Sequence, residues 1–247
     1  MTKRLQYVIA GVMLLLATSL TGQRAAKFWW FDTGLKAQYG ATSMFNQTVA
    51  DSDDWRYDIG TGYSLGGKIG INKGTSGLTI DVMAATGTAL FEDAREPTAV
   101  RNTELNYKSL DIYALYRNNR QLGYVEIGPK FSILNNAEYS DGVSTEVMDI
   151  TDSFEGNNVN AVLGFGAYFL GSDGAFSGII GLRFEYGLTD IVTPSGHELG
   201  RPVNDANLNT GGAVTHPVFA GISFELNWGL GYYGKASCGG RSKFISF

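Results

Sequence analysis

Four residues in the last quarter of the chain are of the types that nucleophilic chemistry needs. Ser195, His197 and Glu198 are close in sequence, and His216 follows them. A hydroxyl, an imidazole base and a carboxylate together make an acyl-transfer site only when their geometry is fixed. No motif fixes it here, and a polar loop alone does not hold such a site. We therefore predict solvated loop residues, no catalytic residue and no enzyme.

Three carboxylates could bind a cation. Asp51, Asp53 and Asp54 lie in a short polar stretch. However, Trp55 occupies the fifth position, where a calcium-binding loop needs an oxygen ligand, and no Gly follows it. We predict no metal site and no cofactor.

A larger set of charged residues recurs at alternate positions of apolar stretches. In each stretch the apolar residues share one parity and the charged residues the other, so the charges would lie on one face of a strand. Charges of both signs on one face cannot form a dry core, but they can form a cross-linked lumen. The predicted lumen network comprises Lys36, Lys68, Asp81, Asp111, Glu126, Lys130, Arg183, Glu185 and Glu225, with Asp32 on the same parity.

The stretch Val218–Tyr232 shows the pattern most clearly. Its even positions are apolar throughout, and its odd positions are mostly small or polar. The alternation holds for roughly fifteen residues, about three times the usual strand length. A tilted membrane-crossing strand with extramembrane ends needs that length.

Seven further alternating stretches precede it. They begin with 28–45 and 57–71 and continue with stretches around 78–84, 109–117, 125–133, 159–169 and 176–189. Tight turns are predicted at 72–77, 117–121 and 172–174, and long polar loops at 47–55, 92–104, 135–157 and 193–215. Long and short connections therefore alternate.

This alternation predicts an all-β fold: a closed eight-stranded antiparallel up-and-down transmembrane β-barrel. In such a barrel all odd connections share one rim and all even ones the other. Outer-membrane barrels carry short periplasmic turns, long external loops and periplasmic termini. A soluble lipocalin-like barrel would instead point its apolar parity inward. Trp29, Tyr116, Trp228 and Tyr232 are predicted to lie at the membrane interface.

The N-terminus has the pattern of an export signal. Lys3 and Arg4 precede the apolar run Val8–Ala17, which is too short for a spanning helix. We predict a cleaved signal peptide at 1–22, a barrel at 23–236 and a short periplasmic tail at 237–247. Without the signal the net charge changes from −5 to −7, which argues against nucleic acid as a partner. Cys238, the only cysteine, excludes an intrachain disulfide.

The run RFEYGLTDI, from Arg183 to Ile191, carries a family resemblance. With the eight-strand layout it resembles the PorT-type outer-membrane barrel family of Bacteroidetes, over residues 28 to about 236. The terminal Phe247 is similar to the aromatic residue that outer-membrane barrels present to their assembly machinery. The resemblance implies a barrel in the outer membrane of a Gram-negative cell. Only some relatives act in protein secretion, so it implies no single activity.

The function expected from these patterns is non-enzymatic. Eight strands leave an interior that side chains can fill, so the lumen charges are predicted to be a plug. We expect a structural or protein-interaction module that contacts outer-membrane lipid, with protein partners at its external loops or periplasmic turns, in protein secretion or envelope assembly. The alternative is a narrow pore or transporter for small solutes. A lipid-modifying enzyme at the rim of the barrel is a distant third hypothesis.

Overall fold

The computed structural model describes residues 29–230, except 96–100, 121–122, 142–145 and 172–175. Eight long strands form its wall. They are β1 (Trp29–Asn46), β3 (Gly60–Lys73), β4 (Ser76–Asp93), β5 (Arg101–Asn119), β6 (Gly123–Ser140), β8 (Asn157–Leu170), β9 (Phe176–Gly187) and β10 (Thr215–Leu230). The predicted signal peptide and tail, Tyr232, Cys238 and Phe247 lie outside the described residues.

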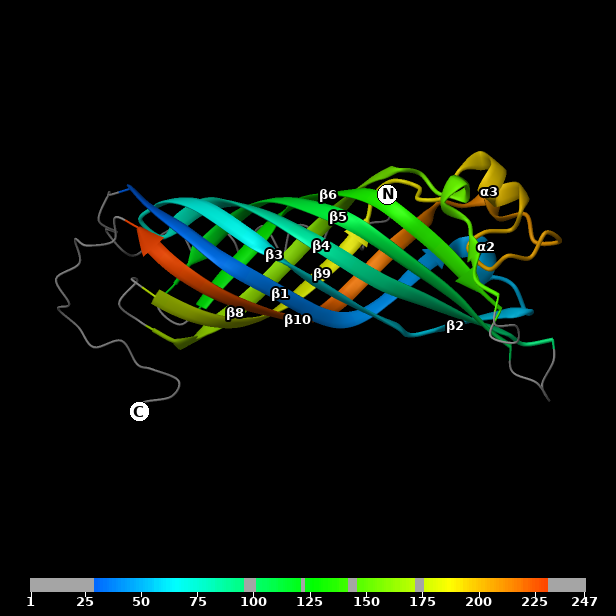
Figure 1. The fold of residues 1–247 in the computed structure, drawn as a ribbon, viewed down its shortest axis with the longest axis horizontal. Helices are drawn as coiled ribbons and strands as arrows, with labels where there is room; N and C mark the ends of the chain where they lie inside the picture. Colours follow the sequence, from blue (N-terminus) through cyan, green and yellow to red (C-terminus); the bar gives the residue numbers. More distant parts are fainter. Residues whose placement is uncertain (1–28, 96–100, 121–122, 142–145, 172–175, 231–247) are drawn as a thin grey trace, which may run out of the picture.

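The wall closes on itself. Each strand pairs antiparallel with the next along the chain, and the first strand also pairs with the last. That closing ladder runs from Phe31↔Leu230 to Asn46↔Thr215. Closure satisfies backbone groups at what would otherwise be two exposed sheet edges. The predicted closed eight-stranded up-and-down barrel is confirmed, and Figure 1 shows it as a cylinder whose strands are tilted relative to its long axis.

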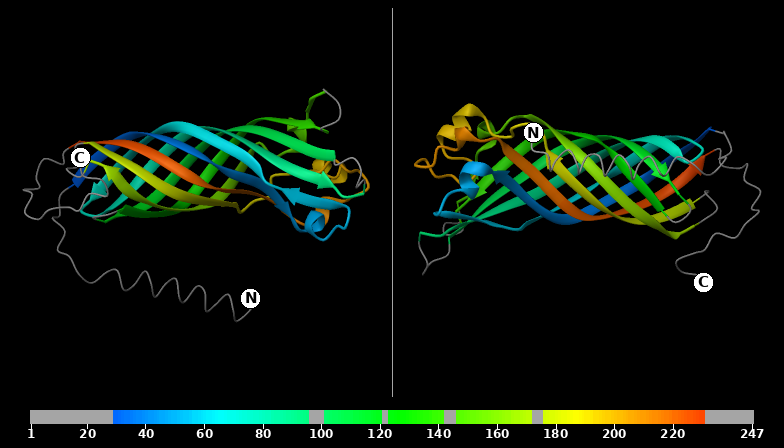
Figure 2. Two further views of the ribbon diagram at one scale, coloured as in Figure 1. Left: turned by 90° about the horizontal axis from the view of Figure 1, so that it is seen from below. Right: turned by 180° about the vertical axis from the view of Figure 1, so that it is seen from behind.

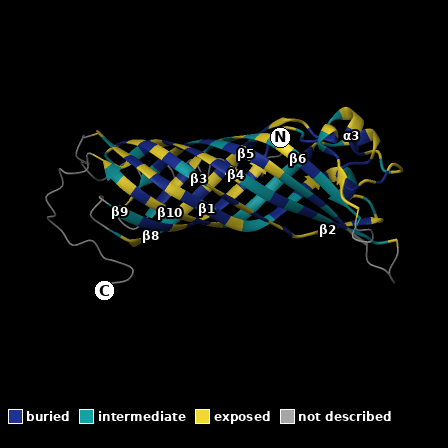
Figure 3. Ribbon diagram, in the orientation of Figure 1, coloured by how far each residue is buried: buried dark blue, intermediate teal, exposed yellow. Residues whose placement is uncertain are grey.

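Exposed and buried residues alternate along much of the wall (Figure 3). On β1, for example, Leu35 is 57% exposed and the next residue, Lys36, is 1% exposed. The outward positions are mostly apolar, so the barrel carries an apolar belt outside and polar side chains inside. This is the reverse of a soluble protein and suits a lipid environment. Among the described residues no helix is both long and apolar enough to cross a membrane.

Two of the four predicted polar loops were wrong in extent. β4 continues to Asp93 and β5 already begins at Arg101, while β6 continues to Ser140. In these segments the outward residues become polar, as at Thr88 and Lys108, while the backbone pairing of the strands continues. The polar residues therefore mark where the strands leave the apolar belt. The strands therefore project beyond the belt into water.

The long connections all lie at one end of the barrel, together with the short elements of the fold (Figures 1 and 2). These elements are α2 (Gln47–Ala50), β2 (Trp55–Asp58), β7 (Met148–Asp149), η1 (Thr151–Ser153), α3 (Pro194–Glu198) and η2 (Thr210–Gly212). They and the projecting strands enclose an apolar cluster, which we call the cap core. It comprises Met44, Val49, Trp55, Ala89, Phe91, Leu105, Ala137, Ile150, Phe154, Ile191, Val192 and Val203, with Tyr57, Tyr107, Leu134, Tyr139 and Leu208 packed against it.

Candidate functional site: the lumen and its cap

All nine predicted lumen residues, and Asp32, point into the barrel. Eight of the nine are at most 5% exposed, and the side chain of Lys130 is 12% exposed. They reach one another because successive strands place inward positions at matching heights, as the pairing Lys36↔Glu225 shows. The structure therefore brings the whole set together inside the lumen.

A compact group of ion pairs fills the middle of the lumen. Lys36 Nζ lies 2.7 Å from Asp81 Oδ2 and 2.8 Å from Glu225 Oε1. Arg117 donates from Nη2 to Glu225 Oε1 at 2.7 Å and from Nε to Glu126 Oε2 at 3.1 Å. Each of these ions is removed from water at a large cost, which only close pairing offsets.

Arg183 completes this group. Its guanidinium donates to Glu126 and, at 3.3 Å, to Asp81 Oδ2, and it lies 4.7 Å from the ring centre of Tyr113. We call Lys36, Asp81, Arg117, Glu126, Arg183 and Glu225 the lumen plug. All six are at most 2% exposed.

Arg117 is the plug residue that sequence reasoning missed. It ends the predicted stretch 109–117 on the charged parity and also begins the predicted turn 117–121, but the predicted lumen network does not include it. In the structure β5 continues to Asn119, so Arg117 is still a strand residue and is 2% exposed. Its position on the same parity as Asp111 is the feature of the sequence that indicates a lumen residue.

Two smaller ion groups lie on either side of the plug. On the tight-turn side, Lys68 Nζ bridges Asp32 Oδ2 at 2.9 Å and Glu225 Oε2 at 3.2 Å, and Asn72 donates to Asp32 at 2.9 Å. On the cap side, Lys130 Nζ lies between Glu185 Oε2 at 2.6 Å and Asp111 Oδ2 at 3.3 Å.

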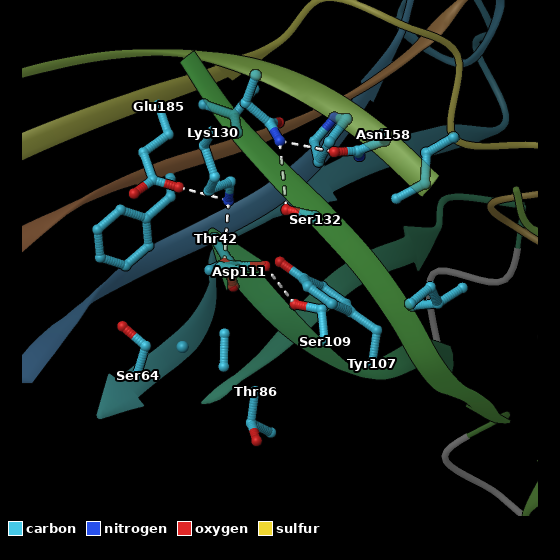
Figure 4. A pocket seen from close by; sticks show the side chains of 18 of the residues that line it. Thr42, Ser64, Thr86, Tyr107, Ser109, Asp111, Lys130, Ser132, Asn158 and Glu185 are labelled. Carbon is cyan, nitrogen blue, oxygen red and sulfur yellow. Dashed lines mark hydrogen bonds and ion pairs between the residues drawn. The ribbon is translucent and has the colours of Figure 1, made fainter. Parts of the chain in front are cut away.

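A cavity opens above the cap-side group, and we call it the chamber (Figure 4). Its volume is about 60 Å³. A water molecule needs roughly 10–15 Å³ of such space, so the chamber holds several. Ser109 donates to Asp111 at 2.8 Å and Tyr113 donates to Glu185 at 3.0 Å, which fixes both carboxylates at the chamber's floor.

The four long connections are tied to one another above the chamber. Asp205, in the last of them, accepts hydrogen bonds from the indole of Trp55 at 3.2 Å and from Arg95 at 2.8 Å. The backbone of Glu155 donates to Ile191 O at 2.8 Å, which joins the third and fourth long connections. The cap is therefore one packed body.

The pKa values of Asp205 and Tyr57 in the cap are shifted from their ordinary values. Burial raises the pKa of the Asp205 carboxyl, but hydrogen bonds from Asn207, Trp55 and Arg95 more than offset this, so its pKa is lowered. Burial raises the pKa of Tyr57 to about 12, although its hydrogen bond with Asn46 acts the other way.

The four candidate catalytic residues do not form one site. His197 is buried and contacts Asp190 Oδ2 at 3.0 Å and Thr210 Oγ1 at 2.8 Å. Ser195 and Glu198 are exposed, and the hydroxyl of Ser195 lies 3.1 Å from that of Thr193.

His216 lies elsewhere, stacked on Tyr186 with ring centres 4.9 Å apart. The partner of His197 is Asp190, which the sequence analysis does not identify. Asp190 also accepts hydrogen bonds from the backbone N–H groups of Val192 and Thr215, at 3.0 and 3.1 Å, and so ties the cap to β10.

The remaining candidates lie on the surface. Asp51, Asp53 and Asp54 are exposed, and no group of three metal-binding side chains gathers within the part of the chain that the structure describes. Trp29, Tyr116 and Trp228 are 60%, 47% and 41% exposed on the outer wall, near its tight-turn end.

Comparison with known proteins gives only distant matches. No protein-family model and no curated protein matches the chain. Neisserial surface protein A aligns with TM-score 0.38 and 11% identity over 78% of this chain and 95% of its own. Ail of Yersinia pestis, solved with the heparin analogue sucrose octasulfate, gives 0.33 and 12% over 79% and 98%. The translocator domain of the autotransporter NalP from Neisseria meningitidis gives 0.26 and 9% over 91% and 95%. These are outer-membrane β-barrel proteins.

Proposed function

We propose that this protein is an outer-membrane barrel that acts without enzymatic chemistry, as a sealed anchor that presents its cap to partner proteins. The observation that carries the proposal is the lumen plug. Six charged side chains, each at most 2% exposed, fill the middle of the barrel and form ion pairs with one another. A transport path would need mobile or hydrated groups there.

The outer membrane is the location that suits this exterior. Leu35, Leu65 and Ile69 are each more than half exposed on the wall, which would be unstable in water but is stabilising in lipid. The predicted signal peptide favours export, and the long connections then face outward from the cell.

The cap is the part best suited to recognition. Loops on a rigid scaffold are where binding residues usually lie, and here the loops share the cap core and so keep a fixed shape. Its surface carries exposed apolar side chains, among them Met148 (56%) and Leu199 (48%). The resemblance to the PorT-type family favours partners in protein secretion or envelope assembly.

Crosslinking in intact cells tests this function. A photo-crosslinking residue at Leu199 should capture a defined partner, and a matched residue at Leu35 on the lipid-facing wall should not. The double substitution Met148→Asp and Leu199→Asp should reduce that capture at least about tenfold while the barrel keeps its heat-modifiable migration on gels. The proposal fails if Leu199 captures no partner and a strain lacking the protein instead loses uptake of one solute, because that result supports the pore.

A further inference from the structure

The chamber has a charged floor and an apolar roof. Its floor is the group Lys130, Asp111 and Glu185 (Figure 4). Its roof includes Tyr107, Leu134 and Ile191, which also belong to the cap core or pack against it. A site with this polarity fits a small amphiphile whose head meets the floor and whose body lies under the cap.

The charges that line the chamber favour a ligand with a positively charged head group. Among the described residues that line the chamber, Lys130 is the one with a positive charge, and it pairs with both Asp111 and Glu185. Glu155 adds a third carboxylate. Each carboxylate oxygen can accept a further hydrogen bond besides those it already receives. The low-dielectric wall of the barrel strengthens the attraction of a positively charged group to this excess of negative charge.

The chamber also differs from the lumen plug in being partly open to solvent. Lys130 is 12% exposed, whereas the side chains of Lys36 and Arg183 are fully buried. Glu155, an exposed residue of the long connection between β6 and β8, lines the chamber on the cap side. A solute therefore reaches the floor from the cap side and stops at the plug.

We propose that the chamber is a binding site for a small primary amine with a short apolar body, separate from partner docking on the cap surface. The ammonium group hydrogen-bonds Asp111 and Glu185, and the apolar body packs against Tyr107 and Leu134. The volume of the chamber limits the ligand to a few heavy atoms beyond the ammonium group.

Three probes with one branched body test the choice of head group: isobutylamine, isobutanol and isobutyrate. Each is titrated into the full-length barrel in detergent micelles, isotopically labelled at the methyl groups of Leu and Ile. The amine should give saturable shifts of the Leu134 and Ile191 methyl signals, and the alcohol and the acid should bind at least about tenfold more weakly. Equal affinity for all three, or no saturable shift with the amine, overturns the proposal.

Matched variants separate the chamber from the rest of the lumen. Asp111→Asn should weaken amine binding about tenfold, the loss expected for one charged hydrogen bond. Asp32→Asn makes the same chemical change on the far side of the plug and should leave affinity within about twofold. Should Asp111→Asn fail to fold, Ser132→Leu fills the chamber without removing charge and should abolish binding. Unchanged affinity in the folded Asp111→Asn or Ser132→Leu variant contradicts the proposed site.

Discussion

Glu225 links the lumen plug to the ion group on its tight-turn side. Its two carboxylate oxygens contact three cations, with Lys36 at 2.8 Å, Arg117 at 2.7 Å and Lys68 at 3.2 Å. Tyr124 donates a fourth contact at 3.4 Å. Buried ion pairs stabilise a protein only while each charge keeps its partners, so this one carboxylate holds together parts of β1, β3 and β5.

The substitution Glu225→Gln should therefore be strongly destabilising. It leaves three buried cations short of negative charge, which costs about 3–5 kcal/mol when one partner of a buried pair is lost. Urea unfolding of the barrel in lipid vesicles measures the loss. Glu198→Gln makes the same change on the exposed surface of α3 and should shift the unfolding free energy by less than about 0.5 kcal/mol. Similar stability of the two variants would show that the plug contributes little.

At the scale of elements, the cap depends on contacts between segments far apart in the chain. Asp205 bonds Trp55, which is 150 positions away, and Arg95, which is 110 positions away. Asp190 similarly joins α3 to the first residue of β10 through His197 and Thr215. These contacts turn four separate connections into one body on top of the barrel.

The cap should loosen in acid. The pKa of Asp205 is lower in the fold than its ordinary value near 4, so its stabilising contribution is present above about pH 4 and is lost as the pH falls through the folded value. Limited proteolysis of the folded barrel from pH 7 to pH 2.5, with an acid-active protease at the low end, should show new cleavage within the cap below pH 4. Asp205→Asn should be cleaved there already at neutral pH. A variant as resistant as the wild type would exclude Asp205 as the link.

Alternation of residue types allowed the barrel wall and most of the lumen to be predicted. The parity that placed Lys36, Asp81 and Glu126 inside needs no knowledge of neighbours, since side chains of a strand alternate between its two faces. The ends of the strands were harder to predict. Beyond the apolar belt the pattern reverses, because inward positions such as Phe91 and Leu105 are apolar and outward positions such as Lys108 are polar. The cap contacts of Asp205 were not predictable, because nothing local in the sequence indicates a partner 150 positions away.

At the scale of the whole molecule, the lumen plug fills the middle of the barrel and the cap covers one end. The chamber lies on the cap side and the Lys68–Asp32 pair on the tight-turn side, with the lumen plug between them. Eight strands give an interior that long side chains can fill, so no separate plug domain is needed.

Conductance across a planar lipid bilayer tests the sealed lumen most directly. Purified full-length barrel, folded as shown by strand-rich circular dichroism, is inserted at single-molecule density in 1 M salt, with a 16-stranded porin as the positive control for insertion. We expect no stable conductance step from this protein at moderate voltage, because the six buried charges of the plug leave no continuous water path. Stable, uniform and large single-channel steps from the folded wild-type barrel would contradict it.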